Sequence, residues 1–98
     1  MSIYIINKKA LEDIDNIWIY TAENWSIKQA DRYYNLIFDE IEYIADNFEM
    51  SRDCGRIRKG YRYSKVKSHL IFFKKSNDNE IEVVRILHER MDIENRLK

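Results

Sequence analysis

The chain has 98 residues, of which 45% are hydrophobic, 13% aromatic and 35% charged. This length corresponds to one domain over residues 1–98, and the apolar content excludes a disordered chain. No run of about 18 apolar residues is present, so no membrane-spanning helix is expected. The N-terminal residues do not have the pattern of a signal peptide, so none is expected, and the single cysteine, Cys54, has no partner for an internal disulfide. A cytoplasmic protein is therefore predicted.

The net charge is zero, but the two halves of the chain differ. Residues 1–50 carry ten acids and four bases, whereas residues 51–98 carry thirteen bases and seven acids. Within the basic half, residues 52–67 contain seven bases and one acid. This asymmetry indicates an anionic partner, either nucleic acid or an acidic protein. The alternative is a solvated face that pairs with the acidic helices.

The first half of the chain predicts one strand and two helices. "SIYII" (2–6) is short and β-branched, as strands are. Apolar residues then recur every three or four positions over 7–25, which predicts a helix capped by Asn7. Its aromatic residues Trp18, Tyr20 and Trp25 are expected in the core and in contacts between the helices. Ser26 and Gln29 fit a capping box that opens a second helix reaching Phe48, so the two helices form an antiparallel hairpin.

After Gly55 the pattern changes to that of strands. Residues 60–65, 69–75 and 80–87 predict three strands joined by the short turns "VKS" and "SNDN". Residues 91–98 form a short helix or a tail. The predicted order is β-α-α-β-β-β, an α+β fold in which the helical hairpin packs on a mainly antiparallel sheet.

The predicted strands are apolar on both faces. Leu70 and Phe72 oppose Ile71 and Phe73 along one strand. Two helices cover only one face, so the other face, or a groove beside it, is expected to be exposed and to bind a protein partner. The alternative is that the C-terminal tail or a second copy of the chain covers it.

The sequence offers no recognisable site for a cofactor or metal, and neither is expected. It has no nucleophile beside an oriented base, no ligand set at metal-site spacing and no Gly-rich phosphate loop. Ribonuclease chemistry stays open, because the predicted strands allow several basic residues and both histidines to meet at one edge of the sheet. Strand alternation, however, sends Arg85 and His88 to opposite faces. A partly buried Arg85 is expected to pair with Asp92 or with an acid of the first helix.

Two blocks of the sequence resemble the ParE toxins of bacterial toxin–antitoxin systems, within the RelE/ParE superfamily. The first is "IWIYTAENWSIKQADRYYNLI" (17–37). The second runs over residues 60–92 and contains "GYRYSKVKSHLIFFKK" and "EIEVVRILHERMD". Together the blocks span nearly the whole chain.

The resemblance implies a RelE/ParE-like fold and a plasmid stabilisation function. It implies a non-enzymatic toxin that inhibits DNA gyrase by protein contact and traps it on cleaved DNA. It also implies a ParD-like antitoxin that neutralises the toxin and makes the contacts of the complex with operator DNA.

The same superfamily includes ribosome-dependent mRNA nucleases of the RelE type, which are the alternative. His69 stands where several of those nucleases have an arginine, and no tyrosine follows His88. Within the ParE pattern, Asn47-Phe48 replaces a common Asn-Pro, and Lys67 replaces a glycine in a turn. These two changes concern loop shape rather than fold.

Candidate site residues follow from the charge pattern and from the resemblance, and no catalytic residue is assigned. Candidates for contact with the target are Arg56, Arg58, Lys59, Arg62, His69, His88 and Arg90. Candidates for contact with the antitoxin are Trp18, Tyr33, Tyr34, Ile71 and Phe73.

Overall fold

A computed structural model describes residues 3–97 and confirms the predicted order of elements. The elements are β1 Ile3–Ile6, α1 Lys8–Asn24, α2 Ile27–Asp46, η1 Phe48–Met50, β2 Arg52–Asp53, β3 Arg62–Val66, β4 His69–Asn77, β5 Glu80–His88 and α3 Ile93–Leu97. Ser2 and Lys98, which belong to the predicted first strand and tail, lie outside the described residues. No helix among the described residues is long and apolar enough to cross a membrane.

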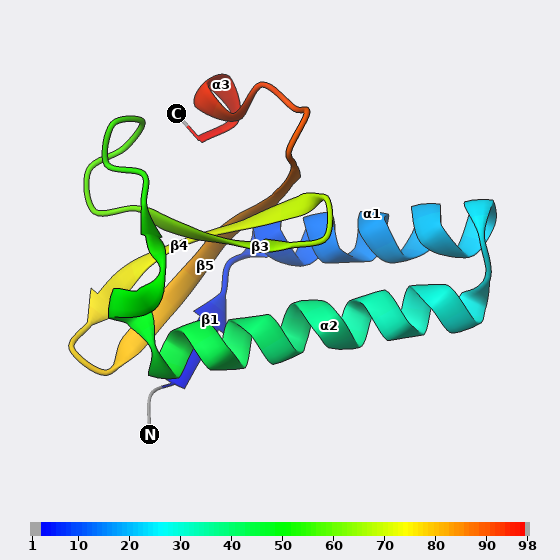
Figure 1. The fold of residues 1–98 in the computed structure, drawn as a ribbon, viewed down its shortest axis with the longest axis horizontal. Helices are drawn as coiled ribbons and strands as arrows, with labels where there is room; N and C mark the ends of the chain where they lie inside the picture. Colours follow the sequence, from blue (N-terminus) through cyan, green and yellow to red (C-terminus); the bar gives the residue numbers. More distant parts are fainter. Residues whose placement is uncertain (1–2, 98) are drawn as a thin grey trace.

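The strands form one sheet in the order β1-β5-β4-β3-β2 (Figure 1). β1 pairs with β5 in parallel, and all other neighbours are antiparallel. The sheet is therefore mainly antiparallel, as predicted. The two-residue strand β2 was not expected, because two residues are too few to show an alternating pattern.

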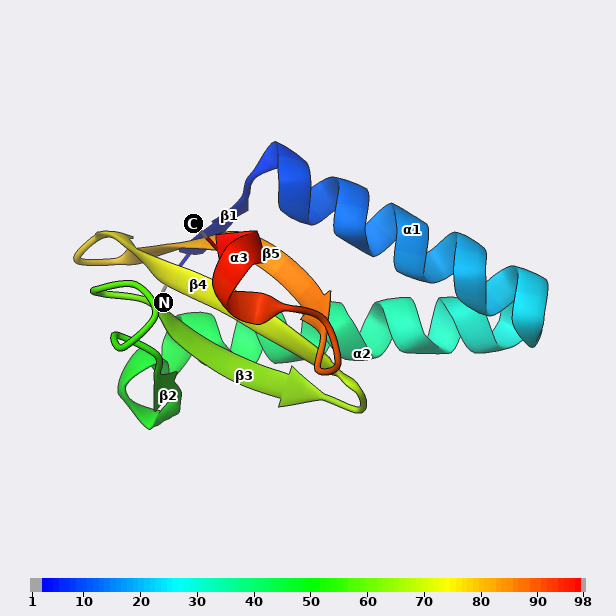
Figure 2. The same cartoon turned by 90° about the horizontal axis from the view of Figure 1, so that it is seen from above.

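The helix boundaries follow from capping. The Asn7 side chain accepts a hydrogen bond from the backbone N–H of Ala10 at 2.9 Å, and Ser26 Oγ accepts one from Gln29 at 3.0 Å. These bonds satisfy donors that the first turn of each helix leaves free. Because Ser26 caps α2 directly after α1 ends, the helices turn back on each other and run side by side (Figures 1 and 2).

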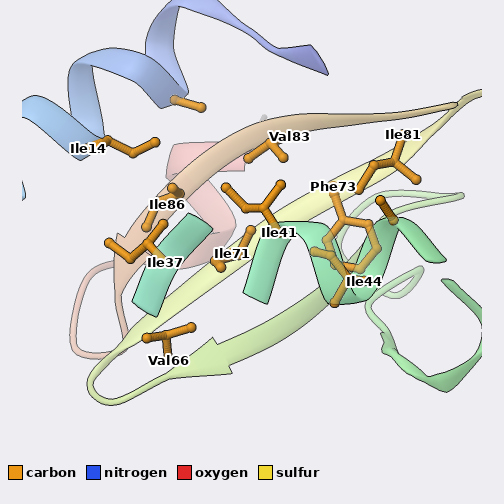
Figure 3. Close-up of a cluster of buried hydrophobic side chains, with 12 residues drawn as sticks. Ile14, Ile37, Ile41, Ile44, Val66, Ile71, Phe73, Ile81, Val83 and Ile86 are labelled. Atoms are coloured by element: carbon orange, nitrogen blue, oxygen red, sulfur yellow. The ribbon is translucent and has the colours of Figure 1, made fainter. Parts of the chain in front are cut away.

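The main core lies between the helical hairpin and one face of the sheet. Figure 3 shows Ile37, Ile41 and Ile44 of α2 gathered with Ile14 of α1 and the apolar side chains of β4 and β5. Its buried members are Ala10, Ile14, Ile37, Ile41, Ile44, Ala45, Val66, Ile71, Phe73, Ile81, Val83 and Ile86. Ile71 and Phe73, predicted as antitoxin contacts, are 0% exposed here and are covered by the helices.

The opposite face of the sheet is covered as well. Its buried residues are Cys54, Tyr61, Phe72, Val84, Leu87 and Leu97. Figure 2 shows α3 in front of the sheet and α2 behind it. The C-terminal segment, together with the loop over residues 54–61, thus buries the second apolar face. Of the two expectations for this face, the covering tail is confirmed and the open face is wrong.

The far end of the helical hairpin extends beyond the sheet (Figure 1). Tyr20 is 64% exposed and Trp25 is 75% exposed, so their predicted place in the core is wrong. Trp18 does join the two helices, because its indole N–H donates to Asp31 Oδ1 of α2 at 2.9 Å. The overhang leaves large aromatic side chains without a sheet to pack on.

An ion pair joins α1 to β5. Arg85 Nε donates to Asp13 Oδ2 at 2.8 Å and Arg85 Nη2 donates to Asp13 Oδ1 at 3.0 Å. The backbone N–H of Ile86 donates to the same carboxylate at 2.9 Å. The expectation that Arg85 pairs with an acid of the first helix is confirmed. Burial of Arg85 opposes its charge, but the bonds to Asp13 are the larger effect and raise the pKa of Arg85.

A register shift interrupts the alternation of faces along β5. Phe72 pairs with Arg85 but Phe73 pairs with Val83, so Val84 is an extra residue. Such a bulge moves the residues after it to the other face. Ile86 consequently packs with Val83 in the main core. Arg85 and His88 both follow the bulge and pair in regular register with Phe72 and His69, so the alternation between these two residues is unchanged. Both nevertheless line the groove described below.

Removing the Asp13 charge is expected to destabilise the fold. Asp13→Asn leaves Arg85 without its partner, and breaking a largely buried pair costs about 3 kcal/mol of unfolding free energy. Asp15→Asn, two residues away on an exposed position of the same helix, should change it by less than about 0.5 kcal/mol. Urea unfolding followed by circular dichroism measures both. Equal midpoints for the two variants would contradict the role of Asp13.

Candidate partner-binding groove

A groove with a volume of about 1310 Å³ lies where the helical hairpin overhangs the sheet. Side chains of α1 and α2, the β3–β4 turn, the end of β5 and the segment after it line this groove. Its apolar surface comes from Ile17, Tyr20, Trp25, Tyr33, Leu36, Ile86 and Met91. Because Tyr20 and Trp25 are mostly exposed, the groove presents large apolar side chains to solvent.

The charged side chains around the groove are mainly basic. Lys9, Arg32, Lys67 and Arg96 line it, and its acids are Glu12 and Asp13. The Asp13 carboxylate is engaged by Arg85 at 2.8 Å. An anionic group is therefore favoured in this groove over a cationic one.

A hydrogen-bonded chain forms one end of the groove. Tyr33 Oη of α2 donates to the carbonyl of Val66 at 2.9 Å and lies 2.6 Å from His69 Nδ1. Since the hydroxyl proton goes to Val66, His69 Nδ1 carries the proton that bonds to Tyr33. This chain ties α2 to the β3–β4 turn, where Lys67 has the positive φ of 54° that reverses the chain. Burial raises the pKa of Tyr33 to about 12, so the hydroxyl keeps its proton.

His69 and His88 are neighbours on adjacent strands. Their rings meet edge to face with centroids 5.2 Å apart. His88 Nδ1 accepts a hydrogen bond from the backbone N–H of Arg90 at 3.1 Å, which fixes its other nitrogen as the donor. Burial and the neighbouring His88 lower the pKa of His69 to about 4. His69 is thus neutral at pH 7 and a weak base, poorly matched to general acid–base catalysis.

The predicted target residues fall into two groups at opposite ends of β3 and β4. His69 and His88 line the groove, and Arg90 follows on the exposed segment after β5. Arg56, Arg58, Lys59 and Arg62 lie at the other end, before or at the start of β3. The structure therefore does not bring the seven candidates into one site.

Two of the basic candidates make structural contacts. Arg58 Nη1 donates to the carbonyl of Leu97 at 2.8 Å, and Arg62 Nη1 donates to the carbonyl of Ser51 at 2.7 Å. Arg62 also lies 5.0 Å from the centre of the Phe48 ring. Arg56 and Lys59 are exposed. Arg58 is exposed as well, but its guanidinium is bonded to Leu97, so Arg56 and Lys59 are the candidates of this loop more available to a partner.

The predicted antitoxin residues are divided as well. Tyr33 lines the groove, whereas Trp18 and Tyr34 line a smaller hollow with Asp15, Ile19 and Asp31. Ile71 and Phe73 lie in the core and offer no surface. Other groove residues carried no site signal in the sequence: Tyr20, Trp25, Arg32, Leu36 and Met91. The sequence signal available for this groove was the apolar stripe of the two helices, which is longer than the strands that it covers.

No group of three or more histidine, cysteine, aspartate or glutamate side chains among residues 3–97 is placed to hold a metal ion. Cys54 lies in the cluster under α3, where burial and the nearby Asp53 raise its pKa to about 11. At neutral pH this thiol is protonated, and a protonated thiol is a poor nucleophile.

Comparison with known proteins identifies the family. The sequence profile described as "ParE toxin of type II toxin-antitoxin system, parDE" matches residues 4–93. Toxin ParE1 of Mycobacterium tuberculosis is 34% identical over 94 residues, which cover 96% of each chain. Toxin ParE1 of Caulobacter vibrioides is 32% identical over 94% of each chain. Toxin ParE of Escherichia coli is 30% identical over 99% of this chain and 94% of its own.

A solved structure agrees in fold. A chain of the chromosomal ParDE system from P. aeruginosa superposes with a TM-score of 0.76 at 18% identity, covering 90% of this chain and 95% of that one. The P. aeruginosa chain therefore shares the α+β fold with a helical hairpin on the sheet. The chain belongs to the ParE toxin family of type II toxin–antitoxin systems.

The neutral state of His69 predicts a pH dependence of stability. The folded-state pKa of about 4 lies below the ordinary value of 6.5, so the unfolded chain takes up the proton first as the pH falls. The stability that neutral His69 provides above pH 6.5 should be lost progressively down to pH 4. We expect this loss to be about 2 kcal/mol.

Comparison of variants separates the pH-dependent contribution of His69 to stability from that of the carboxylates. His69→Gln should lack the loss between pH 6.5 and 4, whereas His88→Gln should retain most of it. Unfolding free energies from urea titrations at several pH values measure the difference. An NMR titration placing the His69 pKa near 6.5 would sink the prediction.

Proposed function

We propose that the chain is a non-enzymatic toxin that inhibits DNA gyrase by protein contact and that a ParD-like antitoxin neutralises it by occupying the groove. The groove beside the overhanging hairpin is the observation that carries the antitoxin part of the proposal. Membership of the ParE family supports the gyrase part. A cytoplasmic location follows from a target and a partner of this kind.

The groove suits a segment that is both apolar and acidic. Tyr20 and Trp25 supply large apolar surface, and aromatic side chains of this kind provide most of the energy of protein interfaces. Lys9, Arg32, Lys67 and Arg96 favour carboxylates at the rim. An amphipathic helix or an added strand with acidic side chains meets both requirements. A disordered antitoxin segment that folds on binding satisfies this description.

The state of the histidines supports a binding role over a nuclease role. His69 is neutral, partly buried and engaged by Tyr33 at 2.6 Å. Mechanisms that cleave RNA need a base and an acid whose pKa values lie near the working pH. We propose His88, Arg90, Arg56 and Lys59 as the residues that contact gyrase. Operator DNA would be contacted through the antitoxin.

Two parallel reactions test the choice between gyrase and the ribosome. In the first, the purified chain is added to gyrase with relaxed plasmid and ATP. In the second, it is added to ribosomes programmed with a defined mRNA. We expect loss of supercoiling with accumulation of cleaved, protein-linked DNA, and intact mRNA. Cleavage of the mRNA with normal supercoiling would overturn the proposal and favour the RelE-type nuclease.

The antitoxin part predicts a charge-dependent loss of affinity. Arg32→Glu places a carboxylate in the groove and should weaken binding of the cognate antitoxin about tenfold or more at low salt. Lys28→Glu is the matched control, because Lys28 lies on the same helix, is exposed and does not line the groove. Isothermal titration calorimetry at two salt concentrations measures both. Equal affinities of the two variants would place the antitoxin elsewhere.

A further inference from the structure

The segment after β5 contacts two different parts of the molecule. Met91 and Arg96 line the groove beside the hairpin. Ile93 and Leu97, within the same few residues, pack on the opposite face of the sheet. One short segment is therefore a wall of the groove and a cover of the second apolar face.

One side chain holds the end of this segment. Arg58 Nη1, in the loop that also covers the second face, donates to the carbonyl of Leu97 at 2.8 Å. The Arg58 guanidinium also lies 5.3 Å from the centre of the Tyr61 ring, and this cation–π contact helps to fix its position. Leu97 is 4% exposed and contacts the cluster that contains Cys54 and Tyr61.

Helix α3 cannot hold its own position. It has five residues, and helices this short are not stable without tertiary contacts. The backbone N–H of Glu89 donates to the Ser68 carbonyl at 2.8 Å and its side chain pairs with Lys65, which holds the start of the segment. Residues 90–92 and 94–96 are exposed, so beyond Glu89 the packing of Ile93 and Leu97 and the bond from Arg58 carry the attachment. Where Met91 and Arg96 lie in the groove thus depends on contacts made on the other face of the sheet.

We propose that Arg58 and Leu97 are positioning residues for the groove, and that the C-terminal segment is a movable wall whose place this anchor sets. The step from the wall to partner affinity rests on the proposed function, whereas the step from the anchor to the wall does not. Arg58, which the sequence suggested as a target contact, acts here through the segment that it holds.

The anchor is tested first on the protein alone. Methionine methyl NMR reports the wall through Met91, and Met50, which is 75% exposed and does not line the groove, is the internal reference. Labelling of Cys54 by a thiol reagent at fixed pH reports opening of the cover. Arg56→Ala is the matched control, because Arg56 is an exposed arginine of the same loop.

Arg58→Ala should shift the Met91 signal toward that of a free side chain and leave Met50 unchanged. It should also speed Cys54 labelling about tenfold, the effect of losing one hydrogen bond from a charged donor. Arg56→Ala should change neither readout. Arg58→Lys keeps a charged donor, so it should change both readouts less than Arg58→Ala does. Leu97→Ala, which removes the apolar half of the anchor, gives the same readout if Arg58→Ala does not fold. An unchanged Met91 signal in both anchor variants would overturn the proposal.

A double-mutant cycle tests the step to the partner. Arg58→Ala and Arg96→Ala should each weaken binding of the cognate antitoxin, and the double variant should lose less than the sum, because both act on the same wall. Additive losses would show that Arg58 does not act through Arg96. If the anchor variants change neither the Met91 signal nor the Cys54 labelling rate, the role of the anchor is contradicted. If the chain does not bind an antitoxin at all, only the proposed function is contradicted.

Discussion

A sheet that is apolar on both faces needs two covers, and the rest of the structure follows from this constraint. Phe72 and Phe73 are neighbours in sequence, yet they lie in different buried clusters, at 2% and 0% exposure. Leaving either face in water would expose side chains that each contribute about 2 kcal/mol by burial. The helical hairpin covers one face, and the loop over 54–61 with α3 covers the other. The cover formed by the loop over 54–61 and α3 is short, so its attachment to the sheet depends on few contacts.

The groove exists because the two covers do not match the sheet in size. α1 and α2 run past the end of the strands (Figure 1), so their apolar stripe continues where no strand is available. Tyr20 and Trp25 lie on this continuation. β5 ends at the same place, and the chain continues there as the C-terminal segment, which crosses to the face of the sheet opposite the helices. The overhang and the crossing segment therefore form two walls, and the bond from Tyr33 Oη to the Val66 carbonyl, at 2.9 Å, ties the first wall to the β3–β4 turn.

The elements were predictable because each has a local signal. Asn7 and Ser26 cap the helices, and alternation marks β4 and β5. What local patterns do not contain is where one element ends relative to another, and the misplaced residues show it. Trp25 obeys the helical spacing but lies beyond the sheet. Ile71 and Phe73 obey strand alternation, but the pattern does not say which face the helices take. The bulge at Val84, which places Ile86 in the main core with Val83, depends on pairing with β4 and has no signal in the sequence of β5.

In the fold, several residues of the basic half of the chain contact other parts of the same domain. Within residues 52–67, Arg58 holds the C-terminus, Arg62 holds Ser51, and Lys65 pairs with Glu89 at 3.2 Å. Three of the seven bases in this run thus make contacts within the domain, and Lys67 lines the groove. The basic rim instead collects Lys9, Arg32, Lys67 and Arg96 from four distant parts of the chain. Exposed charges of this kind act mainly on association rate and partner choice, while the apolar floor supplies the affinity. A partner is therefore selected by acidic side chains and retained by aromatic contacts, and it meets both only where the C-terminal segment is in place.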